Sequence, residues 1–158
     1  MANWPTESQW RAMCGRVLGI PYEYGGEDTD GTDCTGLIQL VLRGPGFNYA
    51  AAPRDSTATL KERLSGKAPR TMSQGIGVFI NNQNGIDFEG SKHAGLVLPC
   101  MEADGTVGVR YLHASSSRGV VLDKTMTGKV WVFPIQTAYP ALKAGAAQEV
   151  TDGGDDRP

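Results

Sequence analysis

The sequence predicts one α+β domain in which N-terminal helices pack on an antiparallel sheet of about five to six strands. The length of 158 residues, with 40% hydrophobic and 20% charged residues, suits a single domain with one core. Before Gly75 the apolar residues recur at helical spacing. After Gly75 short β-branched and aromatic runs alternate with Gly, Asn and Asp turns, which is typical of antiparallel strands.

The first predicted helix spans residues 6–18. Its apolar residues fall on one face at the spacing of an α-helix: Trp10, Met13, Cys14, Val17 and Leu18. Thr6 stands at the start and Gly19 at the end, where a helix favours such residues. Because Cys14 lies on the apolar face, we interpret it as a core residue, and Cys100 likewise.

The second predicted helix runs from Cys34 to about Leu42, after a loop rich in glycine and acidic residues. It is apolar almost all round, which indicates a central, buried helix. The segment Arg43-Gly44-Pro45-Gly46 ends it. A third helix, capped by Asp55 or Ser56 and ending at Leu64, is mostly polar and is predicted at the surface.

Strands are predicted at residues 76–80, 93–99, 107–113, 119–122 and 129–133. Residues 81–92 form a polar insertion between the first two strands and are a candidate rim loop. These elements define a domain of residues 1–140. Residues 141–158 are small, polar and acidic, so we predict a tail that is flexible or held by a partner.

Composition argues against several classes of protein. The net charge is −2 and Lys and Arg form no run, which disfavours a nucleic-acid surface. No apolar stretch approaches the roughly 20 residues of a membrane span. The N-terminus lacks the basic and apolar regions of a signal peptide. The three cysteines have no metal-ligand spacing and are too few for a disulfide framework, so neither a metal nor a cofactor is expected.

Cys34 stands where a glycine-rich loop enters the central helix. The helix dipole and the unpaired N–H groups there favour a thiolate. The only two histidines, His93 and His113, begin one predicted strand and end the next, with a hairpin turn at Asp104-Gly105 between them. That turn places His93 opposite residue 113 or 114, so the imidazoles are predicted to be near neighbours. A slip of one residue would place the two rings on opposite faces.

These three residues match the parts of a nucleophilic site. Cys34 would attack a carbonyl as a thiolate, His93 would take and return the proton, and His113 would orient His93. The backbone N–H of Cys34, with Tyr22 as a second candidate, would stabilise the oxyanion. Two alternatives stay open: each residue is structural, or the three bind zinc, although their spacing is not a zinc signature.

The same stretches resemble a known family. The run GIPYEYGG at residues 19–26, followed by TDCTGL at residues 32–37, resembles the cysteine motif of the NlpC/P60 family, papain-like peptidases that cut peptidoglycan stem peptides. The run KHAGLVL at residues 92–98 resembles its histidine strand. The run LHAS at residues 112–115, with Gly119-Val120, resembles its third-residue segment. The match covers roughly Pro5 to Phe133.

The resemblance implies a papain-like NlpC/P60 fold and a triad of Cys34, His93 and His113. It implies that Tyr22 borders the thiol and that Asp33 and Thr35 bind substrate. The activity implied is a thiol endopeptidase that hydrolyses an amide bond in peptidoglycan stem peptides, of the γ-D-glutamyl type. The sequence departs from the family in having Thr35 for the usual Ser and a long insertion at 81–92.

A family domain without leader or membrane anchor resembles those of phage tails. We therefore expect the protein to lie in the virion and to be cytoplasmic before assembly. Neighbouring phage-tail proteins are the expected partners of residues 141–158. Delivery to the host cell envelope is an alternative to a place in the virion. Another alternative is an antibacterial cell-wall effector injected into rival cells. Another, from a different class, is a structural tail-tip or assembly module on a peptidase fold.

Overall fold

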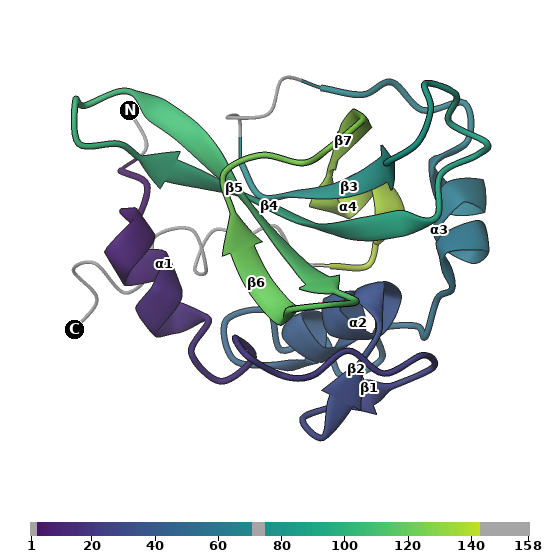
Figure 1. The fold of residues 1–158 in the computed structure, drawn as a ribbon, viewed down its shortest axis with the longest axis horizontal. Helices are drawn as coiled ribbons and strands as arrows, with labels where there is room; N and C mark the ends of the chain where they lie inside the picture. The colour runs from purple at the N-terminus through teal and green to yellow at the C-terminus, as the bar shows by residue number, and fades with distance from the viewer. Residues whose placement is uncertain (1–2, 71–74, 143–158) are drawn as a thin grey trace.

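The computed structural model describes residues 3–70 and 75–142, and they form the α+β fold that the sequence predicts. A five-stranded antiparallel sheet has the order β6-β5-β4-β3-β7 (Figure 1). Its strands are β3 (Gly77–Asn82), β4 (His93–Met101), β5 (Val107–Ser115), β6 (Gly119–Asp123) and β7 (Lys129–Pro134). Each of the five strands predicted after Gly75 is present.

In the described residues four helices accompany the sheet: α1 (Glu7–Met13), α2 (Cys34–Arg43), α3 (Thr57–Leu64) and α4 (Ile135–Ala138). Helix α2 lies against the sheet, as its apolar sequence predicts (Figure 1). Leu37, Ile38 and Leu42 are fully buried and pack in one core with side chains of β3, β4 and β5. Sequence reasoning missed α4 and a two-stranded ribbon of β1 (Glu27–Asp28) and β2 (Gly31–Thr32), because such short elements have no periodicity.

The first helix is shorter than predicted. Thr6 caps it through a capping box with Gln9, but α1 ends at Met13. Gly15 disfavours continuation of the helix, and the chain turns so that the N–H groups of Val17 and Leu18 both reach the carbonyl of Cys14. The turn still buries Val17 beside Trp10, so the predicted apolar face exists although the helix does not span it.

The hairpin of β4 and β5 sets the position of the two histidines. Leu96 lies opposite Leu112, and Val97 lies opposite Tyr111. Continued along the strands, this register places His93 opposite Ser115 rather than opposite residue 113 or 114 as predicted. His113 therefore lies diagonal to His93, two positions along the neighbouring strand. Since side chains alternate with a period of two, both rings still project from the same face.

The C-terminal boundary also differs from the prediction. The side chain of Leu142 is buried in the core, and its N–H donates to the carbonyl of Tyr139. The domain therefore extends at least two residues past the predicted boundary at 140, and residues 143–158 of the predicted tail lie outside the described residues. None of the helices in the described ranges is both long and apolar enough to cross a membrane.

Candidate active site

Cys34 is the first residue of α2, as predicted. Asp33 is the N-cap, and its carboxylate accepts a 2.7 Å hydrogen bond from the N–H of Gly36. Within the described part of the chain, no group accepts a hydrogen bond from the backbone N–H of Cys34. An unpaired N–H at a helix start is a donor suited to a developing oxyanion.

The thiol of Cys34 is buried, at 8% exposure, and its sulfur lies 3.5 Å from Oγ1 of Thr57. Burial raises the pKa of Cys34, opposed by the Thr57 hydrogen bond and by the backbone N–H groups of Ala94 and Thr35. The resting form is therefore the neutral thiol and not the thiolate predicted from the helix dipole. Burial has the largest effect on the pKa of Cys34.

The two imidazoles are hydrogen-bonded to each other. Nε2 of His93 lies 2.8 Å from Nδ1 of His113, and the ring planes meet at 83°. Burial, with a smaller effect of His113, lowers the pKa of His93 to about 4. Burial also lowers the pKa of His113. Both rings are therefore neutral near pH 7, so His93 is free to accept a proton.

Phe79, on β3, supports both rings from the same face of the sheet. Its ring meets His93 and His113 edge-on, with centroid distances of 6.0 and 6.3 Å. Phe79 lies opposite Gly95 of β4, where a Cβ atom would approach the Phe79 ring to 2.6 Å. The missing side chain at Gly95 leaves the space that Phe79 fills beneath the histidines.

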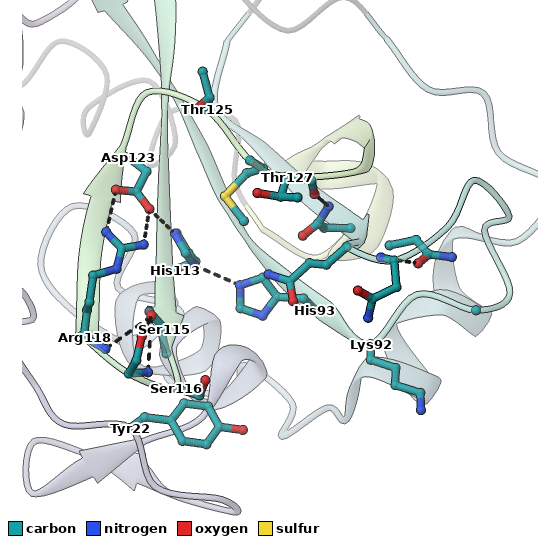
Figure 2. A pocket seen from close by; sticks show the side chains of 18 residues that line it. Tyr22, Lys92, His93, His113, Ser115, Ser116, Arg118, Asp123, Thr125 and Thr127 are labelled. Atoms are coloured by element: carbon teal, nitrogen blue, oxygen red, sulfur yellow. Dashed lines mark hydrogen bonds and ion pairs between the residues drawn. The ribbon is translucent and has the colours of Figure 1, made fainter.

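A carboxylate, missed by the sequence reasoning, lies behind His113. Oδ2 of Asp123 is 2.8 Å from Nε2 of His113, and Arg118 holds the same carboxylate with bonds of 2.7 and 3.0 Å (Figure 2). Asp123 is the last residue of β6, the strand that follows His113 in the sheet. The position of the turn was used to pair His93 with its opposite residue. The same reasoning, applied to the hairpin of β5 and β6, could have placed Asp123 near His113.

Two cavities flank the candidate residues. The first, about 610 Å³, is lined by His93, His113 and polar groups of the 81–92 insertion, and we term it the histidine cavity. The second, about 510 Å³, is lined by Cys34, Asp33, Thr35 and Arg54, and we term it the cysteine cavity. Tyr22 and Lys92 line both and so mark the boundary between them (Figure 2 shows the first).

Asp33 and Thr35 line the cysteine cavity, but their polar atoms already have partners. The Arg54 guanidinium donates to both carboxylate oxygens of Asp33, at 3.0 and 2.9 Å, and to Thr35 Oγ1 at 2.9 Å. It also pairs with Glu27 at 2.7 Å. Arg54 was missed by the sequence reasoning, although it is the only basic residue between Arg43 and Lys61.

Tyr22 lies beside the thiol, as predicted. An isolated bridge to Thr32 fixes its backbone next to the segment that enters α2. Burial raises the pKa of Tyr22, and the neighbouring Cys34 and Asp33 raise it further, so the phenol keeps its proton. In the described residues, the hydrogen bond of the Cys34 sulfur is to Thr57, and none joins it to either histidine.

The chain is similar in sequence to a known protein family. The sequence profile of the NlpC/P60 family matches residues 19–137, a range that contains both cavities' principal residues. The chain belongs to the NlpC/P60 family. The chain is similar to a solved structure described as the NlpC/p60 domain of peptidoglycan hydrolase SagA, with 19% identity, 74% of this chain and 87% of that chain covered, and a TM-score of 0.48. No curated protein matches the chain.

The alternative of a zinc site concerns Cys34, His93 and His113. Within residues 3–70 and 75–142, no three His, Cys, Asp or Glu side chains are grouped so that they could bind one metal ion. The free cysteines Cys14 and Cys100 pack with the core, away from the two cavities.

Proposed function

We propose that the chain is a cysteine endopeptidase that hydrolyses an amide bond in the stem peptides of bacterial peptidoglycan. Membership of the NlpC/P60 family supports a cell-wall peptidase. The observation that carries the residue assignment is the hydrogen bond of 2.8 Å between Nε2 of His93 and Nδ1 of His113, two neutral imidazoles. The nucleophile of the assignment is the thiol of Cys34 at a helix start, which interacts with the backbone N–H of Ala94, the residue after His93. That set contains a nucleophile, a base and a group that orients the base.

In the proposed reaction the thiol of Cys34 loses its proton to His93 as the sulfur attacks the scissile carbonyl. The unpaired N–H of Cys34 donates a hydrogen bond to the carbonyl oxygen and stabilises its negative charge, with the Tyr22 phenol as a second donor. His93 then gives its proton to the leaving amine, which departs and leaves a thioester. Water hydrolyses the thioester with His93 as the base, and the free thiol returns.

Proton transfer at the moment of attack suits the resting state of the site. Burial raises the pKa of Cys34 and lowers that of His93, so an ion pair is disfavoured before substrate arrives. In the free protein the thiol bonds to Thr57, and substrate binding would have to bring the sulfur to His93. Catalytic hydrogen bonds commonly tighten only in the complex with substrate.

The two cavities would take the two sides of the scissile bond. The proton for the leaving amine comes from His93, so the amine side would lie in the histidine cavity. The acyl side, attached to Cys34, would lie in the cysteine cavity, where Asp33, Thr35 and Arg54 offer polar contacts. Lys92, on the boundary, would meet a carboxylate next to the scissile bond, which fits the γ-D-glutamyl bond that the family resemblance implies.

Incubation of purified protein with peptidoglycan, beside Cys34→Ala, tests this proposal. We expect the wild-type protein to release peptides and the Cys34→Ala protein to release none. Mass spectrometry of the fragments identifies the bond. If neither protein releases peptides, the structural reading of the domain is favoured over the enzyme.

The phage-tail context remains a prediction. A pull-down with neighbouring tail proteins, using the full chain and a chain without residues 143–158, tests whether those residues bind them. Retention of the partners by both proteins would exclude the tail segment as the docking element.

A further inference from the structure

The hydrogen-bonded pair of His93 and His113 continues to a carboxylate on the next strand, that of Asp123. His93, His113 and Asp123 come from β4, β5 and β6, three neighbouring strands of the sheet. Tyr111 lies opposite Asp123, so Asp123 is diagonal to His113 just as His113 is diagonal to His93. The three side chains form one diagonal row on one face, with contacts of 2.8 and 2.8 Å (Figure 2).

The carboxylate of Asp123 fixes which ring nitrogen of His113 carries the proton. Hydrogen bonds from Arg118 and His113 lower the pKa of Asp123, so near pH 7 the group is ionised and only accepts. Nε2 of His113, 2.8 Å from the carboxylate, must therefore be the protonated nitrogen. In a neutral imidazole the other nitrogen, Nδ1, is then an acceptor.

The tautomer of His113 in turn determines the tautomer of His93. Its Nε2 faces the acceptor Nδ1 of His113 at 2.8 Å and must donate, so Nδ1 of His93 carries the lone pair. Without the carboxylate, His113 could carry its proton on Nδ1. His93 would then carry its proton on Nδ1, and this nitrogen could not accept a proton from Cys34.

We propose that Asp123 is a positioning residue that sets the tautomers of His113 and His93 and so makes Nδ1 of His93 the base for Cys34. This inference rests on the proposed function for its kinetic consequence, but not for the tautomers themselves. When His93 becomes an imidazolium, the charge of Asp123 stabilises it through the polarised ring of His113. Asp123 itself gains no proton. Arg118, on the turn between β5 and β6, holds the carboxylate in place.

Nitrogen NMR of the ring nitrogens tests the tautomers directly. The chain has two histidines, so a long-range proton–nitrogen spectrum gives two ring systems that a His113→Gln spectrum assigns. In the wild-type protein near pH 7 we expect both rings to be protonated on Nε2. In Asp123→Asn, whose amide both donates and accepts, we expect that preference to be lost. A wild-type spectrum with His113 protonated on Nδ1 would overturn the inference without any Asp123 variant.

Kinetics on peptidoglycan fragments tests the consequence. Asp123→Asn should lower kcat roughly 10- to 100-fold with little change in KM, the size of effect known for the hydrogen-bond partners of metal-binding histidines. Asp123→Glu, which keeps an acceptor, should recover part of the loss. In a His113→Gln background Asp123→Asn should cost nothing further, because Asp123 acts through His113.

Glu102→Gln is the matched control. Glu102 pairs with Arg110 at 2.7 Å near the turn of the β4–β5 hairpin, without contact to the histidines. Loss of this ion pair should alter the free energy of unfolding but leave kcat and the tautomers of His93 and His113 unchanged. An equal loss of kcat from Asp123→Asn with and without His113 would mean a structural role and would overturn the inference. If the wild-type protein releases no peptide, the proposed function fails, while the NMR result still decides the role of Asp123.

Discussion

His93 and His113 make a 2.8 Å contact from diagonal positions on neighbouring strands, not from directly opposite ones. The contact depends on the register of a long hairpin whose turn, at Glu102–Gly105, lies far from the histidines. A shift of one residue would turn the rings to opposite faces and break the pair. The hairpin is thus part of the proposed catalytic machinery, although its turn lines neither the histidine cavity nor the cysteine cavity.

The roles proposed for the two histidines predict unequal losses. His93→Ala removes the base and should abolish nearly all turnover, like Cys34→Ala. His113→Ala only releases the base from its orientation, so kcat should fall strongly but stay measurable. Peptide release from peptidoglycan fragments, followed by chromatography, gives kcat and KM for each variant. Equal residual rates for His113→Ala and Cys34→Ala would contradict the orienting role.

The raised pKa of Cys34 predicts how its alkylation depends on pH. The rate of reaction with iodoacetamide should keep rising above pH 9, the ordinary thiol value, because burial favours the neutral form. Thr57→Val removes a hydroxyl that favours the thiolate and should shift the rise to still higher pH. Mass spectrometry separates Cys34 from Cys14, whose pKa burial raises to about 11. A plateau near neutral pH would instead indicate a preformed thiolate–imidazolium pair.

The lowered pKa of His93 predicts a loss of stability in acid. The pKa is about 4 in the folded protein against an ordinary value of 6.5, so between these values the unfolded chain binds more protons. The free energy of unfolding should therefore fall as pH drops from about 6.5 toward 4, by about 2–3 kcal/mol from this group at pH 4.5. Carboxylates contribute a fall of the same sign. Urea unfolding of His93→Gln, which lacks the group, should show a shallower fall, and identical curves would contradict the assignment.

The sequence predicted the five strands of the sheet and the positions of Cys34, His93 and His113 at the ends of their elements, and the reasons are local. Alternating apolar runs and the Asp104-Gly105 turn predicted the hairpin of His93 and His113, and a loop entering an apolar run predicted Cys34 at a helix start. The register was wrong by one or two residues, because turn position alone does not determine which residues pair.

Residues that act through long-range contacts were missed. Asp123, Arg54 and Thr57 reach the site from segments with no motif of their own, and only the folded arrangement brings them to His113, Asp33 and Cys34. The state of the thiol was also predicted with the wrong direction. The helix start was visible in the sequence, whereas the burial that raises the pKa of Cys34 depends on the whole fold.

The position of Lys92 between the cavities predicts a preference for acidic substrates. Lys92→Met should raise KM about fivefold for a stem peptide with a free carboxylate beside the scissile bond, the size expected of a solvent-exposed ion pair. It should leave kcat unchanged and have no effect on the corresponding amide. Lys67→Met, at an exposed lysine outside both cavities, is the control. Equal effects of Lys92→Met on the acid and the amide would exclude the contact.

The space at Gly95 predicts that one methyl group there disturbs both histidines. A Cβ at Gly95 would lie 2.6 Å from the Phe79 ring and 2.5 Å from the carbonyl oxygen of Leu112, so the ring beneath the imidazoles must move. Gly95→Ala should lower the free energy of unfolding by about 1–3 kcal/mol, the usual range for overpacking. It should also lower kcat, because the support of His93 and His113 shifts.

A smaller side chain at Phe79 tests that explanation. In the Gly95→Ala background Phe79→Leu should recover part of the stability, whereas alone it should destabilise, so a double-mutant cycle gives a coupling between the two sites. Gly105→Ala is the control for the loss of a glycine: its φ of +86° strains an alanine, but it lies in the hairpin turn with open space around it. It should cost stability and leave kcat unchanged. An unaltered kcat in Gly95→Ala would mean that the histidine pair does not depend on Phe79 for its geometry.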